Sequence, residues 1–141
     1  DGLSGLIIDR YAEVLSIRVG AAAWLPWLPF IREHLAARTG LRRVHFAAEP
    51  DARDREDLDE TLVRAESRHA PDSVRIRESG FRYDVDVAGG QKTGFYLDQR
   101  DSRVRVAAYA PGCEVLSAYC YSGSFEVHAA AAGAASILGL D

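Results

Sequence analysis

The chain has 141 residues, of which 48% are hydrophobic and 27% charged, an ordinary composition for a globular domain. Its net charge of −4 excludes a surface that is basic throughout, so any contact with nucleic acid has to be local. The two cysteines do not form a C-x-x-C pair, and no apolar stretch is long enough to cross a bilayer, so we expect no zinc site, no disulfide framework and no membrane span.

The start of the chain carries no targeting signal. Asp1-Gly2-Leu3 is not a basic stretch followed by an apolar one, so no signal peptide is expected and a cytoplasmic location is favoured. Methionine is absent, which indicates a piece trimmed from a longer protein. Lysine occurs once, as Lys92, against sixteen arginines, which hints that this position needs a primary amine.

The first half begins with strands and a helix. Residues 6–11 and 14–19 are predicted to form two short strands, and the second alternates apolar and polar side chains. The short link that contains Ala12-Glu13 predicts a hairpin. Apolar residues at helical spacing then predict a helix over residues 28–38. Gly40 stands where a helix C-terminal cap is expected. A third strand is expected over residues 42–47.

Residues 49–60 are rich in charge and poor in apolar side chains, and they contain Pro50. This composition predicts an exposed loop. Its carboxylates lack the turn glycine and the closing glutamate of a calcium loop, so a solvated surface is expected there and no metal site.

A second hairpin is predicted over residues 74–78 and 81–87. Both segments alternate with period two, and Ser79-Gly80 lies between them. Three arginines of this hairpin would share an outward face that could contact phosphate, although a solvated sheet face is the default interpretation. They are Arg75, Arg77 and Arg82.

The second half is predicted to form one helix followed by a strand-helix-strand crossover unit. A helix is expected over residues 98–110. A strand over 114–118, an Ala-rich helix over 123–132 and a strand over 136–140 then predict part of an open parallel sheet. The first of these helices is expected to carry arginines on its surface, at Arg100, Arg103 and Arg105.

The turn at residues 119–124 is the place where a ligand is expected. Ligands of open parallel sheets bind beyond the carboxyl ends of the strands, and free N–H groups at a helix start favour polar groups. Asp141 follows the second strand, where its carboxylate could accept hydrogen bonds from both hydroxyls of a ribose. These features favour a cofactor that contains a nucleoside.

Two cofactors and a ligand-free turn remain as alternatives. A dinucleotide such as NAD favours the pattern G-x-G-x-x-G. This turn has only Gly123, beside the bulky Tyr119 and Tyr121, which disfavours NAD. S-adenosylmethionine carries no phosphate and accepts a turn with fewer glycines, so we favour it over NAD and over an αβ unit that binds nothing.

Three stretches resemble a known family. GQKTGFYLDQRDSR at residues 90–103 closely resembles a signature of bacterial class I methyltransferases that modify carbon-5 of a cytosine in large-subunit ribosomal RNA. VLSAYCYSGSF at residues 115–125 resembles the first cofactor motif of that family, and DGLSGLIIDRY at residues 1–11 is similar to the start of its central domain. The resemblance follows the family's order over the whole chain.

The resemblance implies a domain organisation. In that family an RNA-binding PUA domain comes first, an α+β domain second and a Rossmann-like methyltransferase domain last. Residues 1–86 would be the α+β central domain and residues 87–141 the beginning of the α/β Rossmann-like methyltransferase domain, truncated, with the PUA domain missing. The unpaired edge of such a truncated sheet creates a risk of strand exchange or of a homodimer.

The resemblance also implies site residues and partners. The implied cofactor is S-adenosylmethionine and the implied substrate is ribosomal RNA. Asp141 would hold the ribose hydroxyls, whereas Lys92 and Arg100 would hold either the cofactor carboxylate or an RNA phosphate. The residues expected to wrap the cofactor are Tyr119, Tyr121, Ser122, Gly123, Ser124 and Phe125, together with Gln99 and Arg100. Those expected to close over the cofactor or line the target-base pocket are Lys92, Thr93 and Tyr96.

No catalytic residue is expected within this chain. Methylation at carbon-5 needs a cysteine nucleophile and a base, which that family supplies from later motifs. Neither Cys113 nor Cys120 matches the nucleophile position, so we expect this chain alone to transfer no methyl group. The alternative function is a non-catalytic RNA-docking module, supported by the hairpin arginines.

Overall fold

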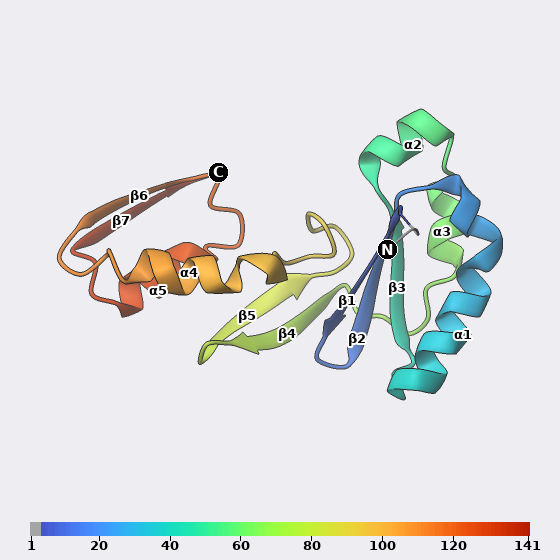
Figure 1. The fold of residues 1–141 in the computed structure, drawn as a ribbon, viewed down its shortest axis with the longest axis horizontal. Helices are drawn as coiled ribbons and strands as arrows, with labels where there is room; N and C mark the ends of the chain where they lie inside the picture. Colours follow the sequence, from blue (N-terminus) through green and yellow to red (C-terminus); the bar gives the residue numbers. More distant parts are fainter. Residues whose placement is uncertain (1–3) are drawn as a thin grey trace. The chain divides into compact units, whose positions relative to one another are not determined.

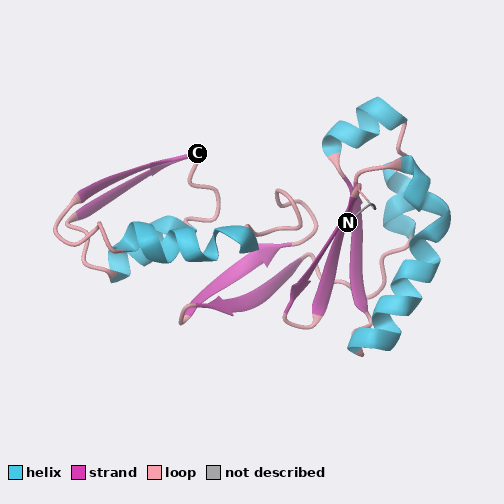
Figure 2. Ribbon diagram, in the orientation of Figure 1, coloured by secondary structure: helices cyan, strands magenta, loops and turns pink. Residues whose placement is uncertain are grey.

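The computed structural model describes residues 4–141 of the chain, so Asp1-Gly2-Leu3, on which the signal-peptide argument rests, lies outside the described residues. The described part contains helices and strands throughout and has a mixed α/β fold (Figure 2). It forms two compact units. Unit 1 runs up to Ile76 and includes Asp84–Phe95, and unit 2 comprises Arg77–Tyr83 and Tyr96–Asp141.

Unit 1 is built on a three-stranded sheet with the strand order β1-β2-β3. β1 (Leu6–Tyr11) and β2 (Val14–Val19) form an antiparallel hairpin whose turn passes through Ala12 at a φ of +51°. β3 (Arg43–Ala48) lies parallel to β2 (Figure 1). The structure confirms all three predicted strands, with β3 shifted by one residue.

A helical crossover joins β2 to β3, as a parallel strand pair requires. It consists of η1 (Ala22–Trp27), a 3-10 helix, followed by α1 (Leu28–Thr39). α1 confirms the predicted helix and extends it by one residue. Gly40 ends the helix in the left-handed conformation, with a φ of +72°, and its N–H donates to the carbonyl of Ala36 at 2.9 Å.

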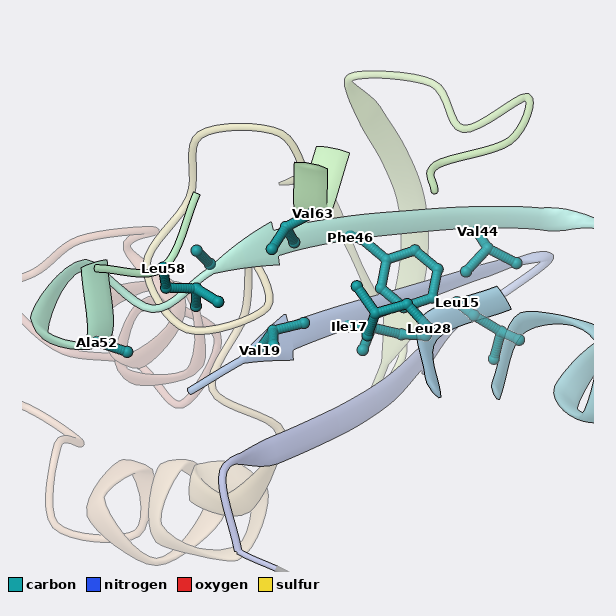
Figure 3. Packing of buried hydrophobic residues seen from close by; sticks show 10 residues of the cluster. Leu15, Ile17, Val19, Leu28, Val44, Phe46, Ala52, Leu58 and Val63 are labelled. Atoms are coloured by element: carbon teal, nitrogen blue, oxygen red, sulfur yellow. The ribbon is translucent and has the colours of Figure 1, made fainter. Parts of the chain in front are cut away.

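The apolar core of unit 1 lies on one face of this sheet, between the sheet and its helices (Figure 3). Alternation along β2 sends every second side chain into this core, and the same holds for β3. The buried cluster contains Leu15, Ile17, Val19, Leu28, Val44, Phe46, Ala48, Ala52, Leu58 and Val63.

The prediction of an exposed loop over residues 49–60 is wrong. This region contains α2 (Pro50–Glu56) and the start of α3 (Glu60–Ala65). Pro50 stands in the first turn of α2, where its missing N–H costs nothing. Asp59 caps α3, because its carboxylate accepts hydrogen bonds from the N–H groups of Thr61 at 2.7 Å and Leu62 at 3.4 Å. Ala52 on α2 and Val63 on α3 are buried in the core, and so is Leu58 between the two helices. These three apolar residues anchor the region to the sheet.

β4 (Ser73–Glu78) and β5 (Phe81–Asp86) form a two-stranded sheet, which confirms the predicted second hairpin. Its turn, Ser79-Gly80, has positive φ at both residues. Side chains alternate between buried and exposed along both strands. The predicted outward arginines are exposed: Arg75, Arg77 and Arg82.

Unit 2 contains the predicted crossover. β6 (Glu114–Ala118) pairs in parallel with β7 (Ser136–Leu140), and α5 (Ser124–Ala131) connects them. The helix predicted over residues 98–110 is shorter, since η2 (Leu97–Gln99) precedes α4 (Arg100–Ala107). The sheet leaves large apolar side chains uncovered, notably Leu116, Leu138 and Leu140.

The prediction that Arg103 lies on the surface is wrong, because its side chain is fully buried. Its guanidinium binds Oε1 of Glu78 at 2.7 Å and donates to the carbonyl of Tyr96 at 3.1 Å. The inward alternation of β4 buries Glu78, so a cation must accompany this carboxylate. Arg100 adds a second contact to Glu78 at 3.1 Å. Burial, followed by the charge of Glu78, also raises the pKa of Tyr83.

The described residues contain neither a membrane-spanning helix nor a group of metal ligands. No helix in residues 4–141 is long and apolar enough to span a membrane. Within the same residues, no three His, Cys, Asp or Glu side chains are grouped so that they could hold a metal ion.

Candidate functional site

The turn between β6 and α5 has an unusual backbone. Tyr119 and Tyr121 adopt positive φ angles of 59° and 45°, and Gly123 follows at 66°. Left-handed conformations are costly for residues with a side chain, and they concentrate where a turn serves a ligand. Tyr119 is 90% exposed, so it makes no packing contribution that would explain its conformation.

Asp141 lies beside this turn. The parallel register sets Ala118 opposite Leu140, so the residues that follow β6 and β7 share one edge of the sheet. Oδ1 of Asp141 accepts a hydrogen bond from the N–H of Tyr121 at 3.1 Å. The structure therefore brings together two predicted cofactor residues that are twenty positions apart in the sequence, and the exposed Asp141 carboxylate has capacity for further donors.

The start of α5 has room for a ligand. Gly123 is the N-cap and has no side chain that could satisfy the first N–H groups of the helix. A Cβ atom placed on Gly123 would meet no atom within 4 Å. Of the other predicted residues in this turn, Ser122 is exposed, Phe125 is half-buried and Ser124 is buried. Small size, open space and free helix-start donors fit a polar cofactor.

Glu126 is a residue that sequence reasoning missed. Both of its carboxylate oxygens are buried without a hydrogen-bond partner. A Cβ atom on Gly139 would lie 3.2 Å from Sγ of Cys120 and 3.6 Å from Oε1 of Glu126, so the carboxylate lies against β7 directly after the turn. A buried carboxylate without a donor is costly, and a cationic or N–H group of a bound cofactor would offset that cost. The available signal was an acidic residue in the first turn of an Ala-rich helix.

The stretch GQKTGFYLDQRDSR at residues 90–103 is called the signature block below, and its second part contacts the same turn. The rings of Tyr96 and Tyr121 meet edge to face, with centroids 5.8 Å apart and an interplanar angle of 89°. Gln99 is half-buried at the end of η2. Arg100 is ion-paired to Glu78. Tyr96 is thus placed against a predicted cofactor residue, whereas Arg100 anchors α4.

The first part of the block lies in unit 1 and covers the polar face of the sheet. Thr93 is fully buried, and its hydroxyl donates to Oδ2 of Asp9 at 2.5 Å and pairs with the hydroxyl of Tyr11 at 2.8 Å. The carbonyl of Thr93 accepts from Ser16 at 2.8 Å, and the carbonyl of Phe95 accepts from Tyr11 at 2.9 Å. These bonds give Thr93 a structural role, and its contact with a cofactor or a base stays a prediction.

One of the three hairpin arginines is already occupied. Arg75 forms a bidentate ion pair with Asp84, with N–O distances of 2.8 and 2.9 Å. Asp84 raises the pKa of Arg75 through this hydrogen bond, and Arg75 in turn lowers the pKa of Asp84. The pair neutralises part of the charge on which the RNA-docking alternative relies.

Two buried histidines predict acid sensitivity. Burial lowers the pKa of His45, and the charges of Arg64 and Arg18 lower it further. Burial, followed by the charge of Arg103, lowers the pKa of His128. Between the folded-state pKa and the ordinary value of 6.5, the unfolded chain binds more protons than the folded chain, so stability falls as the pH drops below 6.5.

Urea titrations at a series of pH values above and below 6.5 would measure this effect. We expect the free energy of unfolding to decrease on acidification, and the decrease to be smaller in the His45→Gln and His128→Gln variants. An unchanged pH dependence in the double variant would contradict a role for these two side chains.

Comparisons with known proteins give consistent results. Residues 51–141 match a family described as S-adenosylmethionine-dependent methyltransferase. The chain is 43% identical to a ribosomal RNA large subunit methyltransferase of Deinococcus radiodurans, and 40% identical to ribosomal RNA large subunit methyltransferase I of Shewanella frigidimarina. Both alignments cover 100% of this chain but only 35% and 36% of the relatives, so the chain spans about a third of their length.

Solved structures share the fold. A presumed S-adenosylmethionine-dependent methyltransferase of Streptococcus mutans superposes with a TM-score of 0.73 at 22% identity, covering 97% of this chain and 35% of that protein. A presumed methyltransferase complexed with SAH superposes with a TM-score of 0.75 at 22% identity, covering 97% of this chain and 34% of the other.

Proposed function

Because the chain belongs to a family of S-adenosylmethionine-dependent methyltransferases, we propose that it carries the first part of the cofactor site of a cytoplasmic ribosomal RNA methyltransferase. Its relatives of 40–43% identity are named as enzymes of that class. We propose further that residues 87–141 begin the catalytic domain. Carbon-5 of a cytosine is the proposed target, on the basis of the GQKTGFYLDQRDSR signature.

The observation that carries this proposal is the meeting of Asp141 with the turn before α5. In the proposed site the Asp141 carboxylate accepts hydrogen bonds from the ribose hydroxyls, while the first N–H groups of α5 bind polar atoms of the methionine portion. Glu126 offers a buried acceptor to a donor of the cofactor. S-adenosylmethionine supplies an electrophilic methyl group when bound.

The nucleophile is proposed to come from outside this chain. Cys120 is half-buried, and its Sγ packs against Gly139. Cys113 is exposed and precedes β6, at the end of the strand opposite to the turn. Cys120 is part of the cofactor turn itself and packs against β7, and neither thiol matches the position of the family's nucleophile, so the proposed role of this chain's own residues is to bind and orient the cofactor.

Calorimetric titration with S-adenosylhomocysteine tests the cofactor assignment. We expect binding of this ligand and none of NAD. The Asp141→Ala variant should bind roughly ten- to a hundredfold more weakly, because it loses charge-assisted hydrogen bonds to the ribose. Glu114→Ala is the matched control, since it removes an exposed carboxylate from the opposite end of the same sheet.

The results discriminate between the alternatives. Equal weakening by both substitutions would point to a general charge effect and contradict a ribose contact at Asp141. Binding of NAD in place of S-adenosylhomocysteine would overturn the cofactor assignment.

A further inference from the structure

A cavity of about 240 Å³ lies wholly within unit 1. It forms where the carboxyl ends of the parallel strands β2 and β3 meet α2, α3 and the loop at residues 88–92. Six charged side chains line it. The four cationic ones are Arg18, Arg53, Arg64 and Lys92, and the two carboxylates are Glu49 and Glu60. The carboxyl ends of parallel strands are a common position for ligand sites.

Cationic side chains outnumber carboxylates in the lining of this cavity. Glu60 is shared, because Oε1 contacts Arg64 at 2.5 Å while Oε2 lies 3.9 Å from Arg53 and accepts from the N–H of Ala48 at 3.2 Å. One carboxylate therefore serves two arginines. The lining holds two more cations than carboxylates, in a chain whose net charge is −4, so the positive charge is concentrated locally.

The loop that carries Lys92 is held in place by its neighbours. Oδ1 of Asp86 accepts hydrogen bonds from the N–H groups of Ala88 at 3.0 Å and Gly89 at 2.8 Å. Arg18 donates to the carbonyl of Gly90 at 2.5 Å and also to the carbonyl of Lys92. Lys92 has a φ of +49° and an exposed side chain. A fixed backbone lowers the entropic cost of binding a ligand here.

The charges of two cavity arginines also act on a neighbouring histidine. His45 is buried on β3, and after burial itself the charges of Arg64 and Arg18 are the largest causes that lower its pKa, outweighing the opposite influence of Glu60 and Asp72. The direction of the His45 pKa therefore agrees with the excess of cations in the cavity lining.

We propose that this cavity binds a phosphate group of the RNA backbone, through Lys92 and Arg53 with Arg64 alongside. Several cationic donors that converge on one concave space suit a phosphate, whose oxygens accept from many directions. The identification of RNA as the source of the phosphate rests on the proposed function. In this proposal Lys92 contacts RNA. Its predicted companion Arg100 belongs to unit 2, where it is ion-paired to Glu78.

Binding of a labelled single-stranded RNA, followed by fluorescence anisotropy at several salt concentrations, tests this proposal. Lys92→Gln and Arg53→Gln should each weaken binding and lower the slope of log affinity against log salt by about 0.7, the value for one phosphate contact on a single strand. Both side chains are exposed, and Glu60 keeps Arg64 when Arg53 is replaced, so folding should be retained.

Arg42→Gln is the matched control. Arg42 is also exposed and lines a different cavity of unit 1, so this variant removes the same charge without touching the proposed site. Inorganic phosphate at constant ionic strength should displace RNA from the wild type and do so less effectively from the Lys92→Gln variant.

Three outcomes would overturn the proposal: no saturable RNA binding, equal losses in the control and the cavity variants, or phosphate binding that does not compete with RNA. Titration of the same samples with S-adenosylhomocysteine separates this result from the cofactor assignment. Retained cofactor binding without RNA binding would reject the phosphate site alone, and the loss of cofactor binding alone would reject the cofactor assignment.

Discussion

Glu78→Gln is expected to lower the free energy of unfolding of unit 2 by about 3–5 kcal/mol, because it leaves a buried guanidinium without its counter-ion. Glu78 is 3% exposed and Arg103 is 0% exposed, so water cannot replace the lost carboxylate. The same carboxylate holds Arg100. The variant therefore loosens α4, the helix that follows Tyr96 and the half-buried Gln99 of the candidate site.

Amide hydrogen exchange in α4 and α5 would measure this effect. Both tryptophans, Trp24 and Trp27, lie in unit 1, so their fluorescence separately reports whether unit 1 stays folded. Faster exchange in α4 and α5 without a matching loss of the tryptophan-monitored transition is the expected pattern.

Two further variants sharpen this test. Asp84→Asn breaks the exposed pair with Arg75 and should change exchange in unit 2 very little, since exposed ion pairs are screened by water. The combined Glu78→Leu and Arg103→Met variant removes both buried charges and should be more stable than Glu78→Gln. Wild-type protection in Glu78→Gln would show that the buried pair contributes nothing to unit 2.

Gly94→Ala is expected to destabilise unit 1 by about 2–5 kcal/mol, from backbone strain and overpacking together. Gly94 has a φ of +121°, and an added Cβ would lie 2.5 Å from the carbonyl oxygen of Asp86 and 2.7 Å from Cγ1 of Val85. Both neighbours belong to β5, so neither can move cheaply. The substitution would also displace Thr93 from its bonds with Asp9 and Tyr11.

Urea unfolding followed by tryptophan fluorescence would measure this loss. Gly40→Ala is the control in the same unit, because Gly40 has a φ of +72° but an added Cβ would meet no atom within 4 Å. The control should lose only the cost of a left-handed alanine, about 1–2 kcal/mol. Equal losses in the two variants would contradict a steric requirement at Gly94.

Local patterns in the sequence were sufficient for most of the elements. Alternation predicted β2, β4 and β5, and the strand-turn-helix-strand order predicted the parallel pairing of β6 with β7. The same order located Tyr121 and Asp141, which the structure joins by a hydrogen bond. These predictions succeeded because a period-two pattern, or the edge shared by parallel strands, depends on nearby residues alone.

Two regions could not be predicted from local pattern. The charged residues 49–60 suggested a loop, yet Ala52 and Leu58 fill gaps in a core made by β2 and β3. Arg103 looked like a solvated helix residue, yet Glu78 draws it inward from a strand 25 positions away. In both cases the deciding contact is made by a residue distant in the chain, which helix or strand periodicity does not record.

The sequence by itself therefore determined most of the elements, their order and the edge at which Asp141 meets the turn before α5, because these follow from patterns within each segment. Only the tertiary structure decided which residues the signature block contacts. It divides after Phe95, and its first part hydrogen-bonds to the polar face of the unit 1 sheet while its second part places Tyr96 against Tyr121 in unit 2. The tertiary structure also places Lys92 in one cavity lining with Arg53 and Arg64, and it buries the carboxylate of Glu126 without a hydrogen-bond partner. The physical reason is that burial and electrostatic potential are sums over neighbours in space, and folding chooses those neighbours.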